Sequence, residues 1–222
     1  MHPREINIGT DKLIVIVGLA FLVMLHWFYY AGGERVVFVV QTAIAATSSV
    51  VTVSATVDST ISCSTQITTS TFGALTTGSV HTASPNASTT VTCANSGSGC
   101  GLYVRGQGDA TNGGLYNSTA TALIESPNAG FNASATLVAG TEGYGIQGTT
   151  TAAGSGGAFA VTPRYLVSLN AVGGLTSTTR ILASSTSGST GREVGVTHKA
   201  AIAAGTAAGT YNDTITYSCT DN

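Results

Sequence analysis

The residues of this chain that could do acid–base chemistry are few and scattered. His81 falls in a predicted turn, and His198 falls in an alternating apolar run at 194–202. A catalytic histidine needs a carboxylate that orients its ring, and neither residue has one close in sequence. Paired carboxylates for hydrolysis would have to come from isolated residues, namely Asp58, Asp109, Glu125, Glu142, Glu193, Asp213 and Asp221. We therefore predict that the protein is not an enzyme and has no catalytic residue.

Two further motifs could bind a cofactor or a metal. Residues 143–148 read GYGIQG and fit G-x-G-x-x-G, but no predicted strand precedes them and no predicted helix follows to direct amides at a pyrophosphate. We interpret them as a turn. Asp109 and Asn112 could offer oxygens to calcium, but one carboxylate falls short of the roughly six to eight oxygens that the ion takes. We expect neither a cofactor nor a metal.

Composition excludes one class of partner and favours one fold class. Charged residues make up 8% of the 222 residues, against about 25% in an average protein, and the net charge is -2. A nucleic-acid surface needs clustered Lys and Arg to displace counterions, so we expect no nucleic-acid partner. Serine, threonine and 28 glycines take the place of charge. This composition favours strands and turns over helices.

The elements that position any site begin after two apolar blocks at the amino end. The first block, residues 13–30, is just long enough to cross a bilayer. The second, residues 36–46, resembles a signal peptide, because Arg35 precedes it and Ala43-Ile44-Ala45 matches the site of signal peptidase.

We expect cleavage after Ala45 or Ala46, with Met24 as a second candidate start. An uncleaved anchor formed by the first block is the alternative. Either arrangement predicts a secreted or cell-surface protein whose only membrane contact is residues 1–46.

Four cysteines lie after the expected cleavage site, and in an exported chain they predict two disulfides. Four cysteines allow three pairings. A Cys93–Cys100 bond would close a small ring around a flexible loop, and a Cys63–Cys219 bond would then constrain the unfolded chain most. Chain entropy favours that arrangement without excluding the others.

From residue 51 onward the dominant period is two. Val51, Val53, Ala55 and Val57 alternate with Thr and Ser, which predicts a half-buried strand. The same alternation recurs at 89–93, 102–104, 133–137, 194–202 and 210–219.

Turns rich in Gly, Ser and Asn separate these runs. Short strands joined by such turns predict an all-β fold, an antiparallel Ig-like sandwich preceded by the hydrophobic amino-terminal helix. We expect a single sandwich domain over 47–222, with a Gly/Ser/Thr-rich variable middle at 105–190. Specificity, if any, would reside in that middle.

Three segments carry a resemblance to a known family. FGALTTGSV at 72–80, STTVTC ending at Cys93 and AAGTYNDTITYSC at the end of the chain resemble exported bacterial sandwich proteins of the spore coat protein U and fimbrial-subunit type. The family shows a Cys in its first strand, as Cys63 here, and the likeness does not extend to residues 105–190. It implies a surface or appendage subunit without chemistry, and a Cys63–Cys93 bond, contrary to the entropic preference.

Two functions follow as expectations. In the first, a structural protein of the cell surface associates with itself or with other surface proteins, and residues 48–57 are donated to a neighbour as a strand. The alternative for that segment is the first strand of its own domain. In the second, a carbohydrate-binding or adhesive module binds a glycan on exposed aromatic rings, drawn from Tyr103, Tyr116, Tyr144 and Tyr165.

Overall fold

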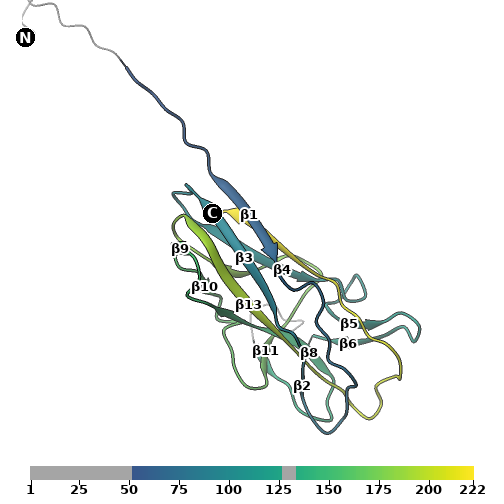
Figure 1. Cartoon of the computed structure of the whole chain (residues 1–222). Helices are drawn as coiled ribbons and strands as arrows, with labels where there is room; N and C mark the ends of the chain where they lie inside the picture. The colour runs from purple at the N-terminus through teal and green to yellow at the C-terminus, as the bar shows by residue number, and fades with distance from the viewer. Residues whose placement is uncertain (1–51, 127–133) are drawn as a thin grey trace, which may run out of the picture. The chain divides into compact units, whose positions relative to one another are not determined.

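The computed structural model describes residues 52–126 and 134–222. Those residues form strands and turns without any helix, and residues 54–222 make up one compact unit (Figure 1). Among the described residues, none belongs to a helix able to span a bilayer. The expected amino-terminal helix, the cleavage residues Ala45 and Ala46, and Val51 lie outside the described residues.

The larger of the sheets has eight antiparallel strands. They are β1 (Thr60–Thr65), β2 (His81–Thr82), β3 (Ala87–Ala94), β7 (Ser134–Thr136), β8 (Gly143–Thr150), β9 (Ser155–Gly156), β11 (Ala171–Gly173) and β13 (Ser189–Ala201). The order is β1-β3-β13-β8-β11-β7, with β2 and β9 also paired to β13. Strand β13 is therefore the centre of this sheet, with β3 along one side and β8 along the other (Figure 1).

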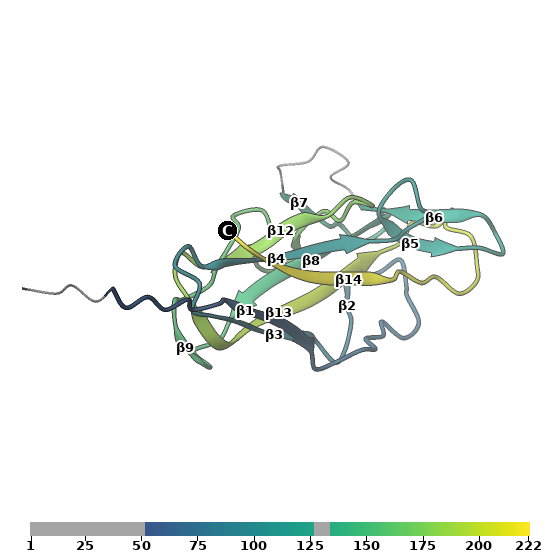
Figure 2. The same cartoon turned by 90° about the horizontal axis from the view of Figure 1, so that it is seen from above.

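The second sheet has four antiparallel strands in the order β10-β12-β4-β14. They are β4 (Cys100–Gly106), β10 (Ala160–Val161), β12 (Arg180–Ser184) and β14 (Ile215–Asp221). A separate hairpin consists of β5 (Gly114–Asn117) and β6 (Ala122–Glu125). Figure 2 shows β4, β12 and β14 as one layer beside the layer of β1, β3 and β13.

Both sheets contribute side chains to one hydrophobic cluster. From the larger sheet come Val91 and Val194, and from the smaller come Leu102 and Leu182, all without exposed surface. Every second residue of β3 is buried, as expected for a strand with one face toward a core. Burial of large apolar side chains stabilises a fold by about 1.5–3 kcal/mol each, so this shared cluster holds the two sheets together.

Alternation located several strands correctly. The runs predicted at 89–93, 102–104 and 194–202 overlap β3, β4 and β13, whereas only the second half of the run at 210–219 falls in β14. The run at 133–137 contains β7, and its first residue lies outside the described residues. In β14 the predicted inward side, Ile215, Tyr217 and Cys219, is half-buried while the intervening residues are exposed.

Residues 143–148 are not a turn, as the sequence had indicated, but most of β8. Their glycines serve close packing. A Cβ on Gly145 would lie 2.7 Å from the carbonyl oxygen of Gly173, and one on Gly148 would lie 2.8 Å from Val161 Cγ1. The glycines let β11 and β10 approach β8, so they match a nucleotide motif without forming a phosphate loop.

Two other local predictions were wrong. Residues 52–57 belong to no strand and are exposed, so the predicted half-buried strand does not form there; the first strand begins at Thr60. His81 begins β2 instead of lying in a turn. In both cases alternation or turn composition described the local sequence, but pairing with β3 or β13 decided where strands formed.

Candidate functional site

The first unusual surface is an exposed apolar segment at the amino end, defined here as residues 52–57 and called the amino segment. Val53 is 89% exposed and Val57 is 74% exposed. They and Ala55 recur at every second position, so a strand formed from this segment would present all three on one side. Exposed valines with this spacing are suited to pairing with the edge of another sheet.

A second exposed apolar surface adjoins the edge strand β7. It consists of Val138 and Leu169, which are 58% and 85% exposed, and we call it the β7–β11 patch. The Leu137 N–H donates to the carbonyl of Asn170 at 2.8 Å, so Val138 and Leu169 directly adjoin a bonded pair that continues the β7–β11 ladder. The sequence did not predict this patch because its apolar residues do not alternate along a predicted strand. Only their exposure in the structure reveals them.

Two disulfides join the four cysteines, Cys63 to Cys219 and Cys93 to Cys100. This is the pairing that chain entropy favours; the Cys63–Cys93 bond implied by the family resemblance is not formed. Cys63 lies on β1 and Cys219 on β14, so the first bond links the edge strands of the two sheets. Their Cα atoms are 6.1 Å apart, an ordinary separation for a disulfide.

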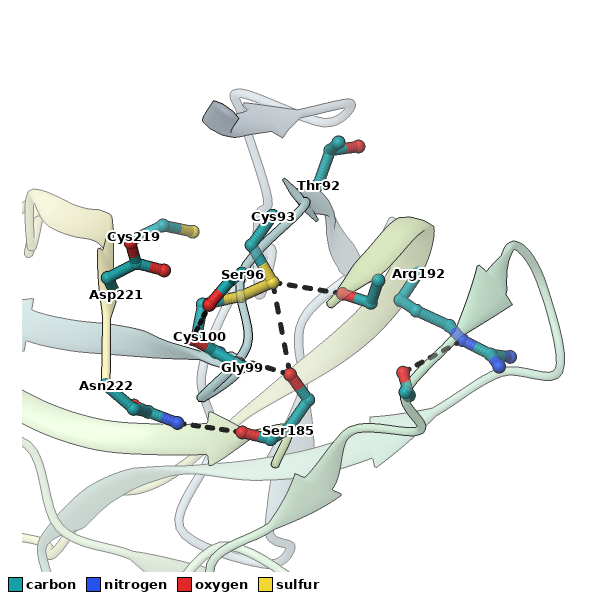
Figure 3. The surroundings of a disulfide bond; sticks show 12 residues. Thr92, Cys93, Ser96, Gly99, Cys100, Ser185, Arg192, Cys219, Asp221 and Asn222 are labelled. Carbon is teal, nitrogen blue, oxygen red and sulfur yellow. Dashed lines mark hydrogen bonds between the residues drawn. A yellow bond between two sulfur atoms is a disulfide. The ribbon is translucent and has the colours of Figure 1, made fainter. Parts of the chain in front are cut away.

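The Cys93–Cys100 bond closes the turn between β3 and β4 in a buried polar setting (Figure 3). Cys93 Sγ lies 3.3 Å from Ser189 Oγ, and Ser185 Oγ accepts a hydrogen bond from the Cys100 N–H at 3.2 Å. The side-chain amide of Asn222 donates to the Ser185 carbonyl at 2.7 Å, which holds the end of the chain against this turn (Figure 3). These contacts anchor the bond structurally, and none of the four cysteines is left as a free thiol.

The four tyrosines proposed for glycan binding do not form one platform. Tyr144 and Tyr165 are buried, with 2% and 0% exposure. Tyr103 and Tyr116 are half-buried, and Tyr116 lies on the β5–β6 hairpin away from the strand that carries Tyr103. The prediction is wrong for the buried pair, because their rings fill the core and their hydroxyls bond inside it.

Tyr144 and His198 form a buried polar pair across β8 and β13. The Tyr144 hydroxyl lies 3.0 Å from His198 Nδ1, and the rings are stacked with an interplanar angle of 11°. Burial lowers the pKa of His198 to about 4, so the ring is neutral at physiological pH. His198 is only 7% exposed, so its ring lies in the core beside Tyr144.

A second polar spot lies near the start of β14. Asp213 Oδ1 accepts a hydrogen bond from the Gly108 N–H at 2.9 Å, while Asp213 Oδ2 and the Tyr217 hydroxyl are buried without a hydrogen-bond partner among the described residues. Burial raises the pKa of Asp213. Burial and then repulsion from Asp213 raise the pKa of Tyr217. Both groups are therefore held toward their neutral forms.

The residues considered for calcium act as a turn. Asp109 Oδ1 accepts hydrogen bonds from the backbone N–H groups of Thr111 and Asn112, at 2.8 and 2.6 Å, and these bonds lower the pKa of Asp109. Within residues 52–126 and 134–222, no three His, Cys, Asp or Glu side chains gather as a metal site.

A polar hollow of about 410 Å³ opens on the smaller sheet, lined by residues that include Arg105, Gln107, Ser177 and Thr216. No family model, curated protein or solved structure matches the chain.

Proposed function

We propose that this protein is a non-enzymatic, secreted or cell-surface structural subunit that assembles by lending its amino segment to a second copy. The observation that carries the proposal is the exposure of Val53 and Val57 at alternate positions of a segment outside every sheet. Valines left 89% and 74% exposed gain about 1.5–3 kcal/mol each when they become buried. We therefore expect both valines to be buried against the surface of a partner.

The acceptor is the β7–β11 patch. The two main strand paths end at β1, β7, β10 and β14, and the short strands β2 and β9 are each paired only to β13. The Cys63–Cys219 bond ties β1 to β14, and we choose β7 as the acceptor because of the side chains beside it. Exposed apolar side chains adjoin β7, and Val138 and Leu169 can receive Val53 and Val57 of a second copy. A contact between two different surfaces does not close on itself unless a ring forms, so repeated addition gives a chain.

The sandwich architecture and the surface location belong to the same proposal. Two antiparallel sheets contribute side chains to one core cluster, which supports an Ig-like sandwich of the spore coat protein U and fimbrial-subunit type. Two disulfides in a chain of this size support an oxidising compartment. Non-reducing mass spectrometry of the exported protein would give the mature start and the pairing together, and a retained residue 1 with free thiols would contradict export.

The assembly test uses two variants that each remove one surface. V53S/V57S alters the amino segment and V138S/L169S alters the patch, and light scattering at rising protein concentration should show each as a monomer while the native chain grows. The control T52S/T56S changes the opposite side of the segment and should assemble as the native chain does.

Mixing the two variants gives the sharper result. Each retains one intact surface, so the mixture should form a one-to-one dimer that does not grow further. A native chain that stays monomeric, or a mixture that stays monomeric, would contradict strand donation to this patch.

A further inference from the structure

The outer face of the smaller sheet carries a row of side chains that the proposed assembly does not use. Leu102 and Val104 of β4 point into the core with 0% and 1% exposure. Because side chains alternate along a strand, Gly101, Tyr103 and Arg105 face outward. None of these residues belongs to the amino segment or to the β7–β11 patch.

The Tyr103 ring lies flat against this face, over residue 101, because glycine there has no side chain. A Cβ on Gly101 would lie 2.7 Å from Tyr103 Cε2, 3.1 Å from its Cζ and 3.2 Å from its hydroxyl oxygen. The side chain thus extends back along the strand over Gly101 and remains partly exposed. An aromatic ring laid along a sheet offers a surface on which another flat apolar surface can stack.

The neighbouring strands frame the ring with one apolar and one polar side chain. Ile181 of β12 is opposite Tyr103 in the register and is 37% exposed. Ser218 of β14 is opposite Tyr103 on the other side and is exposed. Tyr103 and Ile181 therefore form a small apolar shelf with a hydroxyl along its border.

The polar hollow begins where this shelf ends. Arg105 is two residues from Tyr103, about 7 Å along the strand, and lines the hollow of about 410 Å³ together with Gln107, Ser177 and Thr216. Arg105 is exposed, and no hydrogen bond or ion pair joins its guanidinium to another described residue. It is the one charged side chain among the residues lining the hollow, and a guanidinium is suited to pairing with an anion.

We propose that this face binds an acidic saccharide, with a sugar ring stacked on Tyr103 and the carboxylate of a uronic acid bound by Arg105. A guanidinium binds a carboxylate through two parallel N–H donors. The amide of Gln107 and the hydroxyls of Ser177 and Thr216 supply the short-range polar partners that sugar hydroxyls require. The proposal is independent of strand donation, because no residue is common to the two surfaces.

Calorimetric titration of the full chain with trigalacturonate tests the site, with the neutral galactotriose as matched ligand. Trigalacturonate should bind saturably and at least tenfold more tightly than galactotriose. R105Q should abolish that difference, and Y103A should weaken both ligands at least tenfold. G101V keeps the ring but removes the space beneath it, so it should weaken both ligands as Y103A does.

K199Q is the control, because it removes a cation from β13 in the other sheet. It should leave both affinities unchanged, and thermal melts should show that all variants fold. Absence of saturable binding, equal binding of the acidic and neutral ligands, or equal losses in K199Q and R105Q would each overturn the proposal.

Discussion

Cys63 and Cys219 bind the outermost strands of two different sheets to each other, although 156 residues separate them in the sequence. The Cys93–Cys100 bond spans a separation of only 7. If loop entropy governs the effect of a cross-link, the stabilisation rises with the logarithm of the number of residues in the loop that the bond closes. The two bonds should therefore differ in their effect on stability.

Removing the Cys63–Cys219 bond with C63A/C219A should lower the free energy of unfolding by about 5 kcal/mol, and C93A/C100A should lower it by about 2 kcal/mol from loop entropy. Urea titration of the native chain and both variants would measure the difference. Cys93 and Cys100 are completely buried, so cavity formation adds to the second value. A C93A/C100A loss far larger than that of C63A/C219A would show that burial and not loop closure dominates.

Replacing a closely packed glycine of β8 with alanine should destabilise the fold. In G145A the new methyl group would meet the Gly173 carbonyl oxygen at 2.7 Å, and this backbone atom cannot move without disturbing the β8–β11 pairing. We expect a loss of about 1–3 kcal/mol in the free energy of unfolding. The control G78A places its methyl group in open space and should change stability by less than about 0.5 kcal/mol. Equal melting temperatures for both variants would contradict close packing at Gly145.

Alternation predicted the strands that have one buried and one exposed face, which is why β3 and β14 were located from sequence. Strand β8 was not predicted, because it is buried along most of its length and is rich in glycine. Neither alternation nor strand propensity therefore indicates a strand there. The prediction of a strand at the amino segment was wrong for the opposite reason. Its alternation is regular, but no strand of its own domain pairs with it.

The candidate site was predicted only in part. The four cysteines were identified from sequence and their pairing was favoured by loop length, because covalent closure depends on separation more than on side-chain packing. Residue type alone could not predict whether the rings of Tyr144 and Tyr103 would be buried. One ring enters the core beside His198 and the other lies over Gly101, and this difference depends on which strand each pairs with.

Ser126 should be more important to stability than its size suggests. Its hydroxyl donates to the Tyr144 carbonyl at 2.6 Å and accepts from the Leu175 N–H at 2.8 Å, and the residue is 2% exposed. S126A would remove the printed partner of the Leu175 N–H and one partner of the Tyr144 carbonyl, and a buried group left unpaired costs about 1–3 kcal/mol. Chemical denaturation should show this loss. The exposed S98A should match the native chain, and an equally small effect of S126A would mean that the backbone relaxes to restore both bonds.

His198 should make the fold less stable as the pH falls below neutrality. Burial lowers its pKa in the folded chain from the ordinary value of 6.5 to about 4. The unfolded chain therefore binds a proton first, and stability present at pH 7.5 is lost as the pH falls from about 6.5 toward 4. The expected loss between pH 7.5 and 5 is about 2 kcal/mol. The raised pKa of Asp213 acts in the opposite direction, because the folded chain then takes up its proton first.

The comparison of variants isolates the histidine from Asp213. Urea titrations at pH 7.5 and 5 should show a smaller loss in H198Q, because glutamine does not titrate in this range, while H81Q retains His198 and should lose as much as the native chain. Equal losses in H198Q and the native chain would mean that His198 is not held neutral beside Tyr144. In that case the buried pair would have to accommodate an imidazolium, with the Tyr144 hydroxyl as the hydrogen-bond acceptor for a protonated Nδ1.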